Sequence, residues 1–260
     1  MALNDEIYIT IVGSGTGLPS SHRGSPCIAI CHRKDRFLFD IGPGSLRSLS
    51  GLGIRFHLLQ GIWITHFHPD HTADFIHLLF ATKYPKIVQK RDPFSIVGPP
   101  GLRRFLSQLQ AAYRPYLDLP KGLLTVQEVS PGDKDPVSWK NLNFTVASTN
   151  HTGESIAIRM QSPGGKAIVY TGDTDFTEDI IGLSEGADLL IIEASFPEGQ
   201  KVKGHLTPGE AGLIAQQAGV KKVVLTHFYP ECLETDIGAQ CRKNFNGEIV
   251  VASDCLRLIV

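Results

Sequence analysis

The chain has 260 residues, of which 42% are hydrophobic and 20% are charged, a composition typical of a globular protein with an ample core. The formal net charge of −1 does not favour stable binding of long nucleic acids, which usually requires a strongly basic face. No apolar run approaches the ~20 residues that a membrane-spanning helix needs.

The sequence shows no sign of export. Residues 1–10 lack the basic stretch followed by an apolar one that marks a signal peptide. The five cysteines follow neither a zinc-binding nor a disulfide pattern. We therefore expect a protein of the reducing cytoplasm that does not bind membranes.

The first elements predict strands and a Gly-rich loop. Residues 6–12 alternate apolar and polar and predict a strand, and the Gly-rich residues 13–17 follow it. These glycines do not complete a dinucleotide-binding pattern, and Pro19 prevents a helix directly after them. A tight loop near the mouth of a site is the interpretation we favour.

A carboxylate is expected at the end of the third predicted strand. Residues 26–31 and 36–40 predict a hairpin, and Pro43 then begins a helix that runs to about residue 52. Asp40, at the end of the second of these strands, could brace a metal-ligand histidine or act as a carboxylate at the helix N-terminus. The sequence is equally compatible with both roles.

The most informative segment is residues 62–71, an apolar strand that breaks into a loop with the pattern H-x-H-x-D-H. In an extended backbone His66 and His68 lie two residues apart and can point to the same side. Asp70 and His71 follow the bend at Pro69 and can point to a second position nearby. The pattern predicts two adjacent metal sites that share one loop.

Further helices and strands follow in both parts of the chain. We expect helices at 72–83, 102–116 and 207–218, the last with a capping box, and strands at 94–97, 123–129, 142–148, 167–174, 188–193, 222–227 and within 241–260. The helix at 102–116 could line a lid or an interface.

Polar residues recur at the ends of the later strands. His151 lies just past one strand, and Asp173, Glu193 and His227 lie at the ends of three others. We expect His151, Asp173 and His227 to bind metal. Glu193 is expected to support the ligands from behind.

Residues 64–70 and 225–231 resemble each other, since both place Thr-His-Phe-x-Pro-acid, with x at the fourth position, at the end of an apolar strand. This similarity predicts one domain, 1–260, made of two similar halves at about 1–148 and 149–260 that face a shared cleft. The alternative is that both halves arrived independently at a common strand-to-loop turn.

The ligand set predicts a dinuclear centre. One group would comprise His66, His68 and His151, the other Asp70, His71 and His227, with Asp173 as the bridge. Imidazole and carboxylate ligands suit two zinc ions, and manganese or iron also fit. A bridging hydroxide between ions about 3.5–4 Å apart would make the centre hydrolytic.

Residues 65–71, together with His151, Asp173 in Thr-Gly-Asp-Thr and His227, resemble the metallo-β-lactamase superfamily over nearly the whole chain. The resemblance implies an α/β fold, a four-layer αβ/βα sandwich with a dimetal cleft.

Within that superfamily, residues 204–207 resemble the ribonuclease Z branch and its cyclic-phosphodiesterase relatives. The resemblance implies that His205 joins the catalytic site, that Asp70 doubles as a proton shuttle, and that homodimers form. A histidine beside two metal ions can stabilise nonbridging oxygens or protonate a leaving alkoxide. A capping or surface histidine is the alternative for His205.

One departure from the branch bears on the substrate. Residues 152–172 predict a plain hairpin turning at 163–165, where typical short tRNA-processing members carry a protruding arm. We therefore expect a phosphodiesterase acting on a small phosphodiester or an RNA 3′ end, with tRNA maturation disfavoured. No substrate-binding residue is assigned; Lys201 and Lys203 could meet phosphate, although solvent exposure is the usual state of lysine.

Other functions remain compatible with the same residues. The first alternative is hydrolysis of an ester, lactone, thioester, aryl sulfate or β-lactam on the same metal site. A non-catalytic metal-binding or nucleotide-sensing module is the second. Redox use of a di-iron centre would need a flavodoxin-like partner that this chain does not contain.

Overall fold

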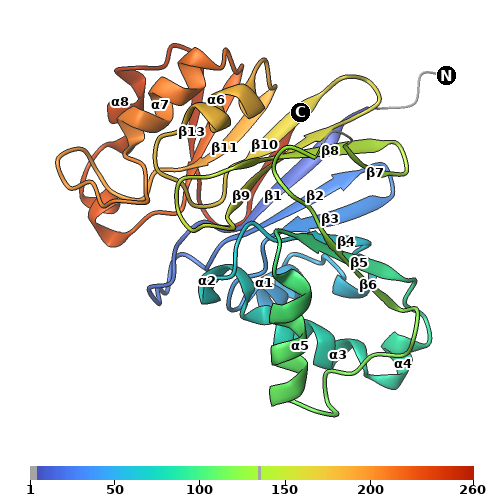
Figure 1. Ribbon diagram of the computed structural model, residues 1–260. Coiled ribbons are helices and arrows are strands. Elements are labelled where there is room, and N and C mark those ends of the chain that lie inside the picture. Colours follow the sequence, from blue (N-terminus) through green and yellow to red (C-terminus); the bar gives the residue numbers. More distant parts are fainter. Residues whose placement is uncertain (1–4, 134–135) are drawn as a thin grey trace.

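Two seven-stranded sheets pack face to face in the computed structural model of the protein (Figure 1). The structure describes residues 5–133 and 136–260. Residues 1–4, part of the segment examined for a targeting signal, and residues 134–135 lie outside the described residues.

The first sheet has the strand order β14-β1-β2-β3-β4-β5-β6, antiparallel from β14 to β3 and parallel from β3 to β6. Its strands are β1 (Ile7–Gly13), β2 (Cys27–His32), β3 (Asp35–Phe39), β4 (Gly61–Trp63), β5 (Phe94–Gly98), β6 (Leu124–Glu128) and β14 (Leu256–Ile259).

The second sheet repeats this pattern in the order β13-β12-β11-β10-β9-β8-β7, parallel from β13 to β10 and antiparallel from β10 to β7. Its strands are β7 (Val137–Trp139), β8 (Leu142–Ser148), β9 (Ile156–Gln161), β10 (Ala167–Tyr170), β11 (Leu189–Glu193), β12 (Lys222–Thr226) and β13 (Glu248–Val251). The chain therefore changes sheet after β6, before residue 148, and β14 returns to the first sheet.

Aromatic side chains join the inner faces of the two sheets. Trp63 of β4 stacks on Phe144 of β8 with ring centroids 4.5 Å apart, and Phe39 of β3 stacks on Tyr170 of β10 at 5.9 Å. Such ring pairs contribute about 0.5–1.5 kcal/mol each beyond the area they bury. They fix how the carboxyl ends of the strands of one sheet face those of the other.

Helices cover both outer faces, so the four-layer sandwich expected from the sequence is confirmed. Buried residues of α1, α3 and α5 pack on the first sheet, and those of α6, α7 and α8 on the second. The helices are α1 (Ser45–Gly51), α2 (Pro69–Thr72), α3 (Asp74–Thr82), α4 (Pro85–Val88), α5 (Leu102–Ala112), α6 (Glu178–Ser184), α7 (Pro208–Gln217) and α8 (Ile237–Arg242), with 3-10 turns at Phe56–Leu58 and Pro230–Glu234. None of the helices in the described part of the chain has the length and apolarity needed to cross a membrane.

Helical structure begins earlier than expected after the metal loop. Pro69 is the first residue of the short helix α2, so Asp70 and His71 lie in a helical turn rather than in a loop. Proline suits this position because its fixed φ is already helical and its missing N–H has no partner in the first turn. The expected helix at 72–83 is therefore α3, preceded by a separate turn that aims two of the candidate ligands.

Candidate metal centre

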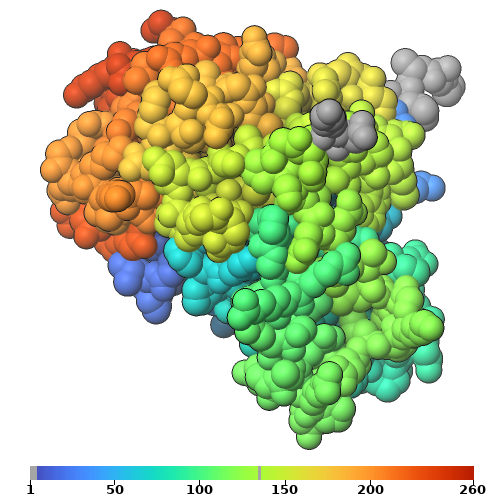
Figure 2. All heavy atoms as spheres, viewed as in Figure 1, coloured from blue at the N-terminus to red at the C-terminus, as the bar shows by residue number. Residues whose placement is uncertain are grey.

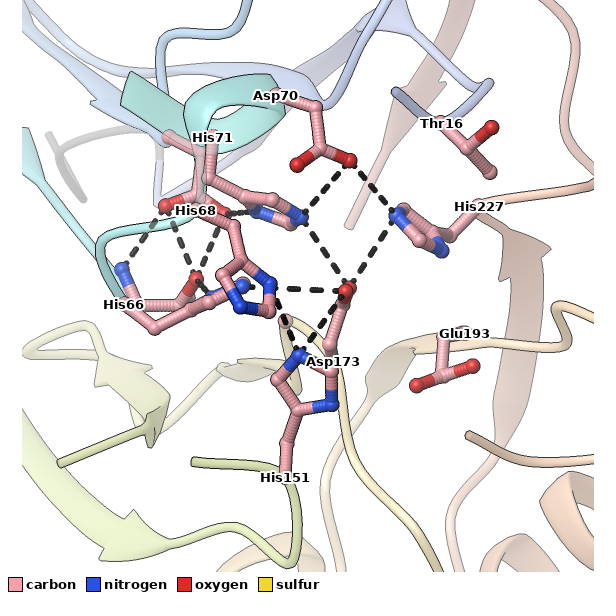
Figure 3. A network of polar contacts seen from close by, with 12 residues as sticks. Thr16, His66, His68, Asp70, His71, His151, Asp173, Glu193 and His227 are labelled. Atoms are coloured by element: carbon pink, nitrogen blue, oxygen red, sulfur yellow. Dashed lines mark hydrogen bonds and ion pairs between the residues drawn. The ribbon is translucent and has the colours of Figure 1, made fainter. Parts of the chain in front are cut away.

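The seven predicted metal ligands meet at one edge of the sandwich, although they come from residues up to 161 positions apart (Figure 3). Their donor atoms form two groups, each within 4.8 Å: His66, His68, His151 and Asp173 in one, and Asp70, His71 and His227 in the other. His66 follows β4 and His227 follows β12, each in the parallel part of its own sheet. A third such group joins Asp173 and His227 with His205. The sequence expected the first two groups with Asp173 between them, and their binding of metal stays a prediction.

Asp173 lies between the two groups. Its Oδ1 is 3.2 Å from Nε2 of His71 and 3.3 Å from Nε2 of His227. Its Oδ2 faces the other group, at 3.9 Å from Nε2 of His66 and 3.7 Å from Nε2 of His151. One carboxylate thus offers one oxygen to each group, as a bridging ligand would.

Several of these donor atoms have no hydrogen-bond partner within the described residues. Nε2 of His66, His71 and His227 and Oδ1 of Asp173 are buried and make no hydrogen bond with the described part of the chain. A buried polar atom left unpaired costs about 1–3 kcal/mol. Four such atoms converging on one point fit a bound cation, because each lone pair would be satisfied by coordination.

Asp40 supports one ring of each group from behind, His71 directly and His66 through Thr65. It accepts hydrogen bonds from Nδ1 of His71 at 2.7 Å, from the Tyr170 hydroxyl at 2.9 Å and from the Thr65 amide at 2.9 Å. The Thr65 hydroxyl, also bonded to Asp40, lies 3.0 Å from Nδ1 of His66. Although burial opposes it, the charges of Asp173 and Asp40 raise the pKa of His71 well above its usual value. A metal at Nε2 would replace the proton there, while Nδ1 keeps its hydrogen bond to Asp40.

The other histidines are oriented in the same way from the second sheet. Nδ1 of His151 lies 2.9 Å from the Gly204 carbonyl oxygen, and Nδ1 of His227 lies 2.8 Å from the Ser195 hydroxyl. The Ser195 hydroxyl donates in turn to Glu193. These partners assign the tautomer that leaves the Nε2 lone pair of both rings for a metal. Nε2 of His227 has no hydrogen-bond partner in the described part of the chain, whereas Nε2 of His151 lies 3.1 Å from Nδ1 of His68.

Replacing Asp40 by asparagine tests this orientation. An amide cannot accept from all three donors, so His71 loses its fixed position, and we expect affinity for the more weakly held metal equivalent to fall about 10–100-fold. Competition with a chromogenic chelator measures it. Asp35→Asn, at the half-buried start of the same strand β3 and paired there with Lys140, is the control. Equal affinities for both variants would mean that Asp40 does not position His71.

His205 lies beside the centre, in contact with Glu193. Its Nδ1 is 3.1 and 3.2 Å from the two Glu193 oxygens, which also accept from the Thr174 amide at 2.6 Å and the Leu206 amide at 3.2 Å. Burial alone would lower the pKa of His205, but the hydrogen bond and charge of Glu193 raise it to about 8. His205 stacks 5.8 Å from His227, which places it at the edge of the second group.

Lys201 is engaged within the protein. Its Nζ lies 2.6 Å from Oδ1 of Asp175 and also pairs with Glu210. Oδ2 of Asp175 accepts from the Gly204 amide at 3.1 Å, the residue whose carbonyl contacts His151. Lys201 therefore holds the turn before His205, while Lys203 is exposed.

The sequence did not single out five residues that shape the site. Thr65, Tyr170 and Ser195 hold ligands from behind, and Phe196 and Tyr229 flank His205 with ring centroids 5.8 and 6.2 Å away. Only Thr65 carried a signal, because its Thr-His step recurs at Thr226-His227.

Comparison with known proteins agrees with this geometry. Residues 35–228 match a family model described as beta-lactamase superfamily domain. Ribonuclease Z of Streptomyces avermitilis is 29% identical over 301 aligned positions, which cover 97% of this chain and 97% of that protein. Because the alignment is longer than the 260 residues of this chain, that relative carries residues with no counterpart here.

Solved structures show the same fold. The metallo-beta-lactamase fold protein YhfI of Bacillus subtilis is 25% identical, with a TM-score of 0.85 over 99% of this chain and 100% of that one. The short form of human tRNase Z is also 25% identical, with a TM-score of 0.78 over 96% of this chain and 98% of that one.

Proposed function

Because the chain belongs to the beta-lactamase superfamily, we propose that it is a hydrolase dependent on two divalent metal ions that cleaves a phosphodiester in a small molecule or at an RNA end. The similarity to ribonuclease Z over almost the full length supports a phosphodiester over other hydrolysable bonds. The single observation that carries the proposal is Asp173, whose two oxygens face two separate groups of metal-type donors.

The metal ions would be held by side chains alone. His66, His68 and His151 would bind one and Asp70, His71 and His227 the other, with Asp173 shared between them. A set of nitrogen and oxygen donors without cysteine suits zinc best, with manganese or iron as the other candidates. When bound, the two ions would lower the pKa of water and neutralise the charge of the phosphodiester.

Asp70 is placed to move a proton. Its Oδ2 is 3.6 Å from Nε2 of His227 and 3.8 Å from Nε2 of His71, and its side chain is 15% exposed. A carboxylate that contacts the centre and also reaches solvent can accept the proton that a water nucleophile loses and pass it on.

His205 is placed to act on the leaving group. Glu193 holds it protonated near neutral pH and fixes its ring beside His227. Phe196 and Tyr229 pack around it and limit water on that side. An imidazolium in this position can protonate a departing alkoxide.

The short hairpin between His151 and Asp173 bears on substrate size. β9 and β10 are joined by a tight turn in which the Gly165 amide donates to the Ser162 carbonyl, so no arm extends from this place. The substrate must therefore be recognised by other parts of the surface.

Metal content and turnover test the proposal together. We expect two equivalents of metal per chain and hydrolysis of bis(p-nitrophenyl) phosphate that chelation abolishes and zinc or manganese restores. His66→Ala should lose metal, whereas His57→Ala, outside the cluster, should not. Fewer than two equivalents, or hydrolysis of a lactone or aryl sulfate with no turnover of the phosphodiester, would contradict it.

A further inference from the structure

Charge is distributed very unevenly along this chain. Residues 74–121 contain eight Lys and Arg but only three Asp and Glu, whereas the rest of the chain contains 17 and 23. This segment comprises α3, α4, β5, α5 and the turns that follow, and we call it the basic lobe. It projects from one end of the sandwich, in teal and green in Figure 2. The net charge of −1 therefore conceals a strongly cationic region.

Most of the lobe's cations are exposed and unpaired. Lys86, Lys90, Arg103, Arg104, Arg114 and Lys121 are exposed and form no ion pair with any residue in the ranges 5–133 and 136–260. The two exceptions are Arg91, which is buried and donates to the carbonyl oxygens of Phe56 and Leu59, and Lys83, which is half-buried and donates to the carbonyl oxygen of Pro115. Unpaired cations gathered in one lobe attract a polyanion.

Aromatic side chains are exposed on the same lobe. Phe80, Tyr84, Tyr113 and Tyr116 are 55%, 57%, 46% and 60% exposed. Phe80 and Tyr116 lie edge to face with centroids 6.4 Å apart, and with Ile76 and Tyr113 they line a cavity of about 590 Å³. Exposed rings interleaved with cations are the features by which proteins bind single-stranded nucleic acid, since every base can stack on a ring.

The lobe is connected directly to the metal centre. Phe67, between ligands His66 and His68, stacks on Phe105 of α5 with centroids 5.1 Å apart. α5 has 11 residues and is about 16 Å long, so it leads from the metal loop to Tyr113 at its far end. Arg103 and Arg104 lie in its first turn.

We propose that the basic lobe binds a single-stranded RNA segment adjacent to the phosphodiester that is cleaved. Arg103, Arg104 and Arg114 contact its phosphates, and Tyr113 and Tyr116 stack on its bases. The inference rests on the proposed function, and it favours an RNA end over a small phosphodiester as the substrate. It also supplies the recognition surface that the short β9–β10 hairpin lacks.

RNA affinity of matched triple variants tests the lobe. The full-length, metal-loaded protein is titrated with a fluorescent phosphorothioate 12-mer RNA, which resists hydrolysis. Arg103→Ala/Arg104→Ala/Arg114→Ala should bind at least tenfold more weakly at 50 mM salt, with a salt slope reduced by about 2. Lys34→Ala/Lys243→Ala/Arg257→Ala removes three exposed cations outside the lobe and should change affinity less than twofold.

Stacking is tested separately from charge. Tyr113→Ala/Tyr116→Ala should weaken RNA binding at least tenfold without changing the salt slope, and Tyr113→Phe/Tyr116→Phe should retain the affinity. If the alanine and phenylalanine variants both bind RNA as tightly as the unmodified protein does, the stacking role is overturned.

The outcomes separate this inference from the proposed function. All lobe variants should hydrolyse bis(p-nitrophenyl) phosphate normally, because that substrate does not reach the lobe. Two results would overturn RNA binding by the lobe and leave the proposed function intact. One is normal turnover by a protein that binds no RNA, and the other is an equal loss of RNA affinity in both triple variants. If the lobe variants lose binding to phosphatidylserine vesicles while their RNA affinity is unchanged, the lobe binds a membrane, and this result would also overturn RNA binding by the lobe. Intact RNA binding by an unmodified protein without turnover would overturn the proposed function instead.

Discussion

Asp173→Asn is expected to reduce phosphodiester hydrolysis by about a thousandfold or more and to lower metal content below two equivalents. The amide keeps the shape of the side chain but provides only one acceptor oxygen and no charge, so it cannot serve both donor groups. Loss of about 4 kcal/mol of transition-state stabilisation corresponds to this factor. Turnover of bis(p-nitrophenyl) phosphate and metal analysis of the same sample measure it.

The control for Asp173→Asn is Asp188→Asn. Asp188 precedes β11 and pairs with Lys221, at the far end of that strand from the centre. The Asp188→Asn protein should keep both metal equivalents and its activity. An Asp173→Asn protein that is folded, by circular dichroism, and retains two metal equivalents and full activity would show that Asp173 does not bridge.

The second large effect is expected from His205→Gln, and it depends on the leaving group. Glutamine can still donate a hydrogen bond to Glu193 but cannot transfer a proton. With a dinucleoside monophosphate, whose leaving group is an alkoxide, kcat should fall about 10²–10⁴-fold. With bis(p-nitrophenyl) phosphate, whose leaving group needs no proton, it should fall less than tenfold.

The ratio of these two effects distinguishes the roles of His205. Equal losses with both substrates would mean that His205 stabilises nonbridging oxygens rather than protonating the leaving group. No loss with either would return it to a structural role. An ester or lactone hydrolase on the same metal centre would also show little dependence on His205.

The convergence of the candidate ligands could be predicted because it depends on local signals. Each ligand histidine or aspartate follows or lies near the end of an apolar strand, and the carboxyl ends of parallel strands meet at one edge of a sheet. His66, His68, Asp70 and His71 also share one short segment. Their convergence with residues from the second sheet could therefore be expected before the packing was known.

The supporting residues could not be predicted in the same way. Tyr170 reaches Asp40 only because β10 faces β3 across the sandwich, with Phe39 stacked on the same ring. Ser195 contacts His227 because β11 and β12 are adjacent in the second sheet. Such contacts depend on the register and packing of sheets, which single residues do not encode.

Short elements were also missed, for physical reasons. α6 follows an N-terminal cap at Thr177 but spans only seven residues, too few for a clear helical period. β7 is three residues long and pairs with β8 over a tight hairpin. The two halves were expected to meet near residue 148. Because β7 and β8 both belong to the second sheet, the chain changes sheet earlier, after β6.

A crystal structure of the zinc-loaded protein, with anomalous scattering measured at the zinc edge, tests the central claim most directly. We expect two peaks, one coordinated by His66, His68 and His151 and the other by Asp70, His71 and His227, with Asp173 bound to both. A single peak, or peaks away from these side chains, would contradict it.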